Sequence, residues 1–152
     1  MRTATRLLLP VVCFGLLAAA QFGCQPSRPA SASTPPPRDG VFIHLTSRDP
    51  HRALMALQMA NLWTADRDVL VYADIEAVHL FLKDSPDVTY KQFPSSHTAI
   101  KNLLSKHVTI YVCPGCLKAA GKTGADLMPG CKVAQKQGFF GFTRGRILSL
   151  DY

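Results

Sequence analysis

The stretch Val108-Thr-Ile-Tyr-Val-Cys113-Pro-Gly-Cys116-Leu-Lys-Ala-Ala-Gly121 decides the fold of this chain. Its first five residues form an apolar run typical of a buried strand, and Pro114 suits the first position of a following helix. In open α/β sheets, ligands bind outside the carboxyl ends of the strands. The sequence therefore places a Cys-x-x-Cys pair where this fold class keeps its site.

Strand-like and helix-like segments alternate on both sides of this stretch. Short apolar runs predict strands at residues 41–46, 69–73, 108–112, 132–134 and 147–150. Helices are predicted from Pro50 to about Trp63 with Asp49 as cap, over 76–82, after Ser95 or Ser96, and from Pro114. Strands separated by helices predict a parallel sheet covered on both faces.

The spacing of the two cysteines sets what they can do. With Cys113 as the helix cap and Cys116 at the third helical position, the positive end of the helix favours a thiolate on Cys113. The α-carbons of such a pair lie roughly 5 to 6 Å apart, which also permits an internal disulfide. An inert disulfide or two packed thiols is the alternative. A zinc site would need further ligands, and only Cys131 and the histidines could supply them, so the favoured prediction includes no metal site.

Two other residues accompany the pair. Cys131 is predicted to begin the next strand, where it either resolves a persulfide or mixed disulfide on Cys113 or packs as a buried thiol. His44 lies near the carboxyl end of the first strand and can line the site, or else it is a hydrogen-bonded packing residue. The chain has neither a glycine fingerprint for a dinucleotide nor phosphate-loop spacing, so no cofactor is expected.

Residues 41–152 resemble the DsrE/DsrF-like sulfur-relay family. The resemblance rests on Asp49-Pro-His-Arg-Ala53, Glu76-Ala-Val78, Ile110-Tyr-Val-Cys113-Pro-Gly-Cys116 and Asp126-Leu-Met-Pro-Gly130. It implies an α/β fold, a Rossmann-like three-layer sandwich with a mainly parallel five-stranded sheet, and frequent homo- or hetero-oligomers. In the relay members one cysteine carries persulfide sulfur between proteins, and Cys113 matches it. This sequence adds Cys116 and Cys131 to the family pattern.

The first forty residues differ in character from the predicted domain, which spans residues 40–152. Arg2 and Arg6 precede an apolar stretch over residues 7–20 that is too short to cross a bilayer as a permanent helix. This arrangement indicates a secretory signal peptide over residues 1–23. We therefore expect the chain to be exported.

Cys24 is the predicted point of attachment to a membrane. The Gly23-Cys24 pair resembles the lipid-acceptor site of a bacterial lipoprotein, whereas cleavage after Ala20 is the ordinary alternative. Residues 24–39 are rich in proline and serine and lack apolar periodicity, which predicts a tether. We expect the domain to be lipid-anchored in the cell envelope, facing the periplasm or the outer surface.

The charge of the chain is moderately basic. It carries 17 Lys and Arg against 10 Asp and Glu, and loss of Arg2 and Arg6 with the signal leaves 15 − 10 = +5. The basic residues are scattered and are not interleaved with aromatic residues, a pattern that argues against a nucleic-acid groove. An anionic membrane surface is a suitable partner, and a solvated surface that maintains solubility is the simpler alternative.

The favoured hypothesis from the sequence is an exported sulfur (persulfide) or thiol-disulfide redox carrier. Cys113 would be the attacking or sulfur-bearing thiolate and Cys116 its resolving partner, acting with sulfur-donor or thiol-redox proteins. The alternative is a non-catalytic, envelope-tethered binding or assembly module whose cysteines form a structural disulfide or a metal site. The sequence leaves open whether the chain is an enzyme, and the resemblance adds a homo-oligomer to the expected partners.

Overall fold

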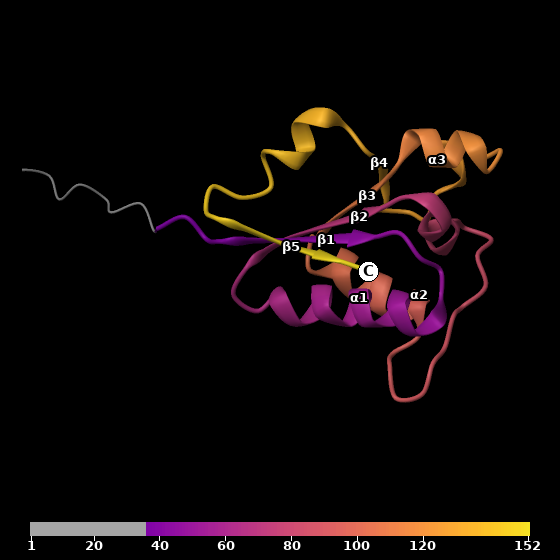
Figure 1. The fold of residues 1–152 in the computed structure, drawn as a ribbon, viewed down its shortest axis with the longest axis horizontal. Helices are drawn as coiled ribbons and strands as arrows, with labels where there is room; N and C mark the ends of the chain where they lie inside the picture. The colour runs from indigo at the N-terminus through magenta and orange to yellow at the C-terminus, as the bar shows by residue number, and fades with distance from the viewer. Residues whose placement is uncertain (1–35) are drawn as a thin grey trace, which may run out of the picture. The chain divides into compact units, whose positions relative to one another are not determined.

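The computed structural model describes residues 36–152. Figure 1 shows this part of the chain as a sheet with helices packed around it. The predicted signal peptide over residues 1–23, the predicted lipidation site Cys24, and all but the last residues of the predicted tether lie outside the described residues.

Five parallel strands form the sheet. Their order is β4-β3-β2-β1-β5, and every pair of neighbours runs in the same direction. The strands are β1 (Gly40–Leu45), β2 (Asp68–Ala73), β3 (Thr109–Val112), β4 (Lys132–Val133) and β5 (Ile147–Asp151). The predicted α/β class and the five-stranded sheet are confirmed, and the sheet is parallel throughout rather than mainly so.

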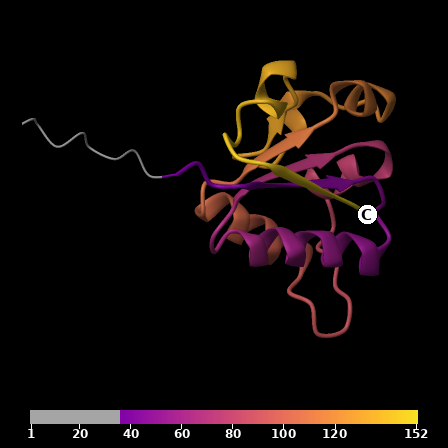
Figure 2. The ribbon, with the colours of Figure 1, turned by 60° about the vertical axis from the view of Figure 1, so that its left-hand side comes forward.

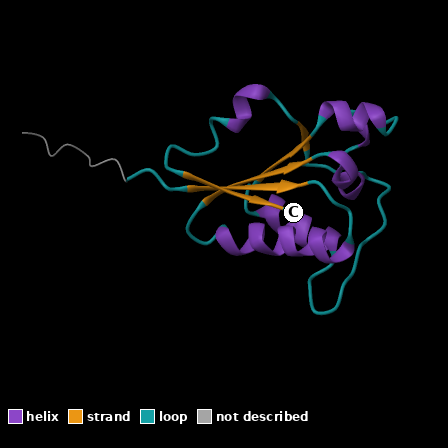
Figure 3. Ribbon diagram, viewed as in Figure 1, coloured by secondary structure: helices purple, strands orange, loops and turns teal. Residues whose placement is uncertain are grey.

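Helices cover both faces of the sheet, which gives the three layers. The α-helices are α1 (Pro50–Trp63), α2 (Ser96–Ser105) and α3 (Pro114–Ala119), and the 3-10 helices are η1 (Ile75–Phe81), η2 (Gly124–Asp126) and η3 (Lys136–Phe139). In Figure 3, α1 and α2 lie below the orange strands, with α3 and η3 above them; the turned view in Figure 2 shows the same arrangement. None of the helices within residues 36–152 has the length and apolarity needed to cross a membrane.

Helix α1 begins and ends where the sequence predicts. The carboxylate of Asp49 accepts a hydrogen bond from the backbone N–H of Arg52 at 3.0 Å, and Pro50 takes the first helical position, where no N–H is needed. The face toward the sheet is fully buried at Leu54 and Leu57. This face and α2 enclose the main apolar core between them and the sheet.

The two faces of the sheet differ in what they bury. On the α1 side, Val41 and Ile43 of β1 are almost inaccessible to solvent. The opposite face is half-buried apart from Leu70, which is fully buried. It carries a row of aromatic rings from three strands and η3: Phe42, His44, Tyr72, Tyr111 and Phe139. Gly138 lets η3 approach closely, since a Cβ there would collide with the ring of Tyr111. This row leads to the carboxyl edge of the sheet.

The second predicted helix has a different form from the expected one. It is a 3-10 helix that begins at Ile75 and ends at Phe81, one residue earlier at each end than predicted. Leu82 is extended and bridges to Leu127 in antiparallel fashion, so it cannot continue the helix. Ile75 itself has a φ of 47°, a conformation that β-branched residues rarely adopt.

Candidate functional site

The two thiols lie at the carboxyl edge of the sheet, at the junction of β3 and α3. The backbone N–H of Cys113 donates to the carbonyl of Ala73 at 2.9 Å, which continues the pairing of β3 with β2 for one residue. Cys113 is then extended, with φ −60° and ψ 120°, and caps α3, whose first residue is Pro114. Cys113 and Cys116 therefore lie where the sequence places them.

Each sulfur accepts a backbone hydrogen bond from a different segment. The N–H of Cys116 donates to Sγ of Cys113 at 3.5 Å, and the N–H of Ile75 donates to Sγ of Cys116 at 3.1 Å. Both thiols are free and half-buried. The turn after β2 and the first turn of α3 thus hold a reduced dithiol, with a donor available to each sulfur.

The two thiols differ in acidity. Burial raises the pKa of Cys113, but hydrogen bonds from the Tyr72 hydroxyl and from the backbone N–H of Cys116 outweigh it, so the pKa lies below its ordinary value. Burial and the neighbouring Cys113 sulfur raise the pKa of Cys116, although the N–H of Ile75 opposes them. These directions favour ionisation of Cys113 over that of Cys116.

Tyr72 stands beside the Cys113 thiol at the end of β2. Burial raises the pKa of its phenol, and the hydrogen bond to Cys113 raises it further. The phenol therefore stays protonated and is a hydrogen-bond donor for a thiolate on Cys113. Its ring stacks on the ring of His44, with 5.6 Å between the centroids.

His44 is held between two carboxylates at the ends of the neighbouring strands. Its Nε2 lies 3.0 Å from Oδ2 of Asp74, and its Nδ1 lies 2.9 Å from Oδ1 of Asp151. Burial lowers the pKa of His44, but the hydrogen bonds to Asp74 and Asp151 outweigh it, and the pKa lies above its ordinary 6.5. The imidazole ring of His44 in β1 therefore links the ends of β2 and β5 at this edge of the sheet.

This link predicts a pH-dependent contribution to stability. Folding raises the pKa of His44 above its ordinary 6.5. Its contribution to the free energy of unfolding is therefore complete below pH 6.5 and is lost as the pH rises through the pKa of the folded state. The melting temperature of the unsubstituted chain should exceed that of His44→Gln by more at about pH 5.5 than at about pH 8.5. Thermal unfolding of both chains across this range measures the difference. A difference independent of pH would contradict the assignment.

Cys131 lies away from the pair. It directly precedes Lys132, which pairs with Tyr111, so it lies at the level of Ile110, three residues before Cys113. Burial raises the pKa of its thiol to about 12, and its side chain packs against the core. This is the environment of a packed thiol, the second of the two roles that the sequence left open.

A groove of about 340 Å³ opens beside Cys116, between η1 and α3. Its lining is mostly apolar and includes the exposed side chain of Ile75, which is 61% accessible. The residues that line it are Ile75, Glu76, His79, Cys116, Ala119 and Ala120. Of the two thiols, only Cys116 lines the groove.

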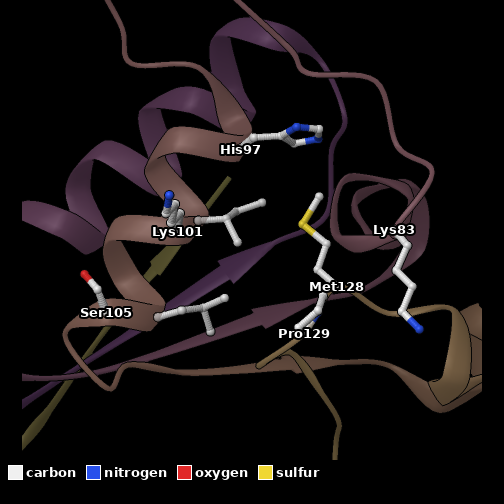
Figure 4. A pocket seen from close by; sticks show the side chains of 8 residues that line it. Lys83, His97, Lys101, Ser105, Met128 and Pro129 are labelled. Carbon is white, nitrogen blue, oxygen red and sulfur yellow. The ribbon is translucent and has the colours of Figure 1, made fainter.

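A larger hollow, of about 500 Å³, lies between α2 and the Met128-Pro129 segment. In Figure 4 the side chain of Met128 stands opposite α2, and Lys83 points away from the hollow. The Nζ of Lys83 donates to the carbonyl of Ala125 at 2.7 Å. No cysteine lines this hollow, so it does not belong to the thiol site.

Metal ligands do not gather at the site. Within residues 36–152, no group of three or more His, Cys, Asp and Glu side chains is arranged to hold a metal ion. Both ring nitrogens of His44 already face carboxylates, so neither is free to bind a metal.

Four residues of the site escape prediction from the sequence. Tyr72 is the penultimate residue of β2 and Asp74 directly follows the strand, and this position at the carboxyl edge is the signal that could have found them. Asp151 is brought to His44 by the pairing of the last strand with the first. Ile75 carries no signal, since nothing in its side chain predicts a positive φ or an N–H directed at a sulfur.

The comparisons with known proteins identify the fold. No family model matches the chain, and no curated protein matches it. One similar structure is MTH1491, a protein of unknown function from Methanobacterium thermoautotrophicum, with a TM-score of 0.57 and 20% identity over 74% of this chain and 99% of that one. Another is the YchN protein from E. coli, with a TM-score of 0.57 and 12% identity over 74% of this chain and 98% of that one.

These two structures share the α/β architecture of this chain, so the fold class implied by the sequence resemblance is confirmed. Identities of 20% and 12% show a common architecture and carry no activity from one protein to another. The chemistry of the chain has to be argued from its own thiol pair.

Proposed function

We propose that this chain is a thiol carrier that uses Cys113 as the attacking or sulfur-bearing thiolate and Cys116 as the resolving thiol. The observation that carries the proposal is the environment of Cys113. A free thiol at the carboxyl edge of a parallel sheet accepts hydrogen bonds from Tyr72 and from the N–H of Cys116, which lower its pKa. A second free thiol lies one helical turn away.

Such a pair supports exchange with a disulfide in two steps. The Cys113 thiolate attacks one sulfur of the disulfide, a mixed disulfide forms, and the other sulfur leaves as a thiolate. Cys116 then attacks the Cys113 sulfur, which forms the internal disulfide and releases the second thiolate. A thiol-redox partner must reduce the internal disulfide by supplying two electrons before the next cycle.

The same thiolate supports sulfur transfer. Attack on the terminal sulfur of a donor persulfide forms a persulfide on Cys113 and releases the donor thiolate. An acceptor thiolate then takes the terminal sulfur and leaves Cys113 as a thiolate. No net oxidation occurs, so this route needs a sulfur donor and an acceptor but no reductant.

The competing function is a non-catalytic binding or assembly module with a static disulfide between Cys113 and Cys116. Alkylation of protein taken directly from cells, followed by mass spectrometry, separates the two. The carrier should yield a reducible pair, and limiting iodoacetamide at mildly acidic pH should label Cys113 before Cys116 and Cys131. Equal, slow labelling of all three thiols, or a bond that resists every reductant short of unfolding, would favour the module.

We further propose that the carrier is exported and held in the cell envelope through lipid on Cys24, with the proline-rich segment as its tether. The support is the sequence pattern around Gly23 and Cys24 and the basic, apolar stretch before it. Cys24→Ser should release the protein from membranes on fractionation. An N-terminus at Gln21 without lipid would refute the proposal. Its partners are then sulfur-donor or thiol-redox proteins, or further copies of the chain, and not nucleic acid.

A further inference from the structure

The groove beside Cys116 combines three features that the thiol chemistry alone does not require. Its walls are mostly apolar, with Glu76 and His79 as the ionisable side chains beside Cys116. One wall carries an exposed isoleucine, Ile75, whose backbone is in a rare conformation. Ile75 has φ 47° and 61% of its side chain exposed, so neither its backbone geometry nor side-chain burial stabilises the fold there. Rare backbone conformations cluster at functional sites, where the surrounding structure holds them in place.

The position of the groove relates it to the reacting sulfur. Cys116 lines it, and the backbone N–H of Cys116 donates to Sγ of Cys113 at 3.5 Å, so the attacking thiol lies within one helical turn of the groove. The N–H of Ile75 donates to Sγ of Cys116 at 3.1 Å, which fixes the isoleucine at the rim. Cys113 itself does not line the groove, so a disulfide attacked by Cys113 reaches Ile75, Ala119 and Ala120 only by extending its substituent past Cys116.

The charge of the groove indicates which substituents fit. Neither lysine nor arginine lines it, and its one carboxylate, on Glu76, is paired with Arg48 at 3.2 Å. An anionic reactant such as thiosulfate or a polysulfide therefore finds no unpaired Lys or Arg side chain among the lining residues. An apolar substituent in the groove would contact Ile75, Ala119 and Ala120, and its apolar surface would be removed from water.

We infer that one exchange partner of the thiol pair is a small, uncharged organic disulfide or persulfide whose apolar substituent occupies this groove. The inference rests on the proposed thiol-carrier function and names its substrate class. A volume of about 340 Å³ is at the small end of the range for ligand pockets and suits a substituent the size of a benzyl group. Ile75 is then a specificity residue, in direct contact with the substituent.

Alkyl methanethiosulfonates test the inference because they share one leaving group. The thiolate attacks the sulfenyl sulfur, a disulfide to the alkylthio group forms, and methanesulfinate leaves with the electron pair. The full chain carrying Cys116→Ser keeps the adduct on Cys113, where its mass is measured over time. The benzyl, 2-sulfonatoethyl and 2-(trimethylammonio)ethyl reagents present apolar, anionic and cationic substituents, and each rate is divided by that of N-acetylcysteine amide.

After this normalisation, the rate of the benzyl reagent should exceed that of the sulfonatoethyl reagent by roughly tenfold. The normalised rate of the cationic reagent should also be lower than that of the benzyl reagent. Ile75→Asn, introduced in the same chain, should remove most of the advantage. Asparagine is suitable because it accepts a positive φ more readily than most residues. Leu62→Asn is the matched control, since Leu62 is also 61% exposed but lies on α1, and it should leave the ratio unchanged.

The outcomes separate this inference from the function on which it rests. Three outcomes with fast reaction at Cys113 would overturn the substrate class and leave the carrier proposal intact. They are equal normalised rates for the three reagents, a charged reagent that reacts fastest, and a rate ratio that Ile75→Asn does not change. A Cys113 that is inert to all three reagents would end the carrier proposal and the inference together.

Discussion

Cys113→Ser should slow the reaction of the chain with a disulfide or a persulfide donor by about a thousandfold or more. A serine hydroxyl is not ionised at neutral pH, and it is a far weaker nucleophile toward sulfur than a thiolate. The hydrogen bonds from Tyr72 and from the N–H of Cys116, which favour the thiolate on Cys113, then have no charge to stabilise. Stopped-flow exchange with a chromogenic disulfide, and the gain of 32 mass units from a persulfide donor, measure the loss.

The control for this substitution is Cys131→Ser. Cys131 is half-buried, and burial raises the pKa of its thiol to about 12, so the thiol is protonated at neutral pH. Its replacement should keep the exchange rate within about twofold of the rate of the unsubstituted chain. A chain that loses exchange equally with either substitution would show that the effect comes from misfolding. A chain that keeps its exchange rate without Cys113 would refute the assignment of the attacking thiol.

The fold was predictable because its elements carry strong local signals. The apolar runs that became β1, β2 and β3 are continuous, and buried parallel strands need such runs on both faces. Asp49 and Pro50 mark the start of α1 by residue type alone. Beyond β3 the local signals weaken, and β4 is only two residues long.

The thiol pair was predictable for a different reason. A strand that ends at Val112 and a helix that starts at Pro114 leave only one place for Cys113, and the polarity of parallel sheets puts that place at the ligand-binding edge. The helix end was expected to lower the pKa of Cys113. The backbone N–H groups of Gly115 and Cys116 at the helix start do lower it, and the hydroxyl of Tyr72, which comes from another strand, is the largest single cause that lowers it.

What the sequence could not show are the contacts between strands. Tyr72 and Cys113 are brought together by the register that pairs Tyr72 with Tyr111, and His44 meets Asp151 through the pairing of β1 with β5. A pattern of residues along one strand contains no information on its neighbours' register. The order β4-β3-β2-β1-β5 is therefore needed before the acid–base surroundings of the thiols can be named.

Cys116→Ser should lengthen the life of a mixed disulfide on Cys113 by about a hundredfold or more when external thiol is scarce. In the unsubstituted chain Cys116 lies in the first turn of the helix that Cys113 caps, so the resolving attack is intramolecular and faster than attack by a dilute thiol. Serine has nearly the same size and can still accept the hydrogen bond from the N–H of Ile75, so the groove should keep its shape.

The measurement loads both chains with a small disulfide, quenches samples with acid, and follows the adduct mass and its position by peptide mapping. In the unsubstituted chain the adduct should give way to an internal disulfide, whereas in Cys116→Ser it should persist on Cys113. An equal lifetime in both chains would remove Cys116 from the resolving role. An adduct that forms first on Cys116 would reverse the two roles, and the hydrogen bond from Ile75 to Cys116 would then be the better mark of the attacking thiol.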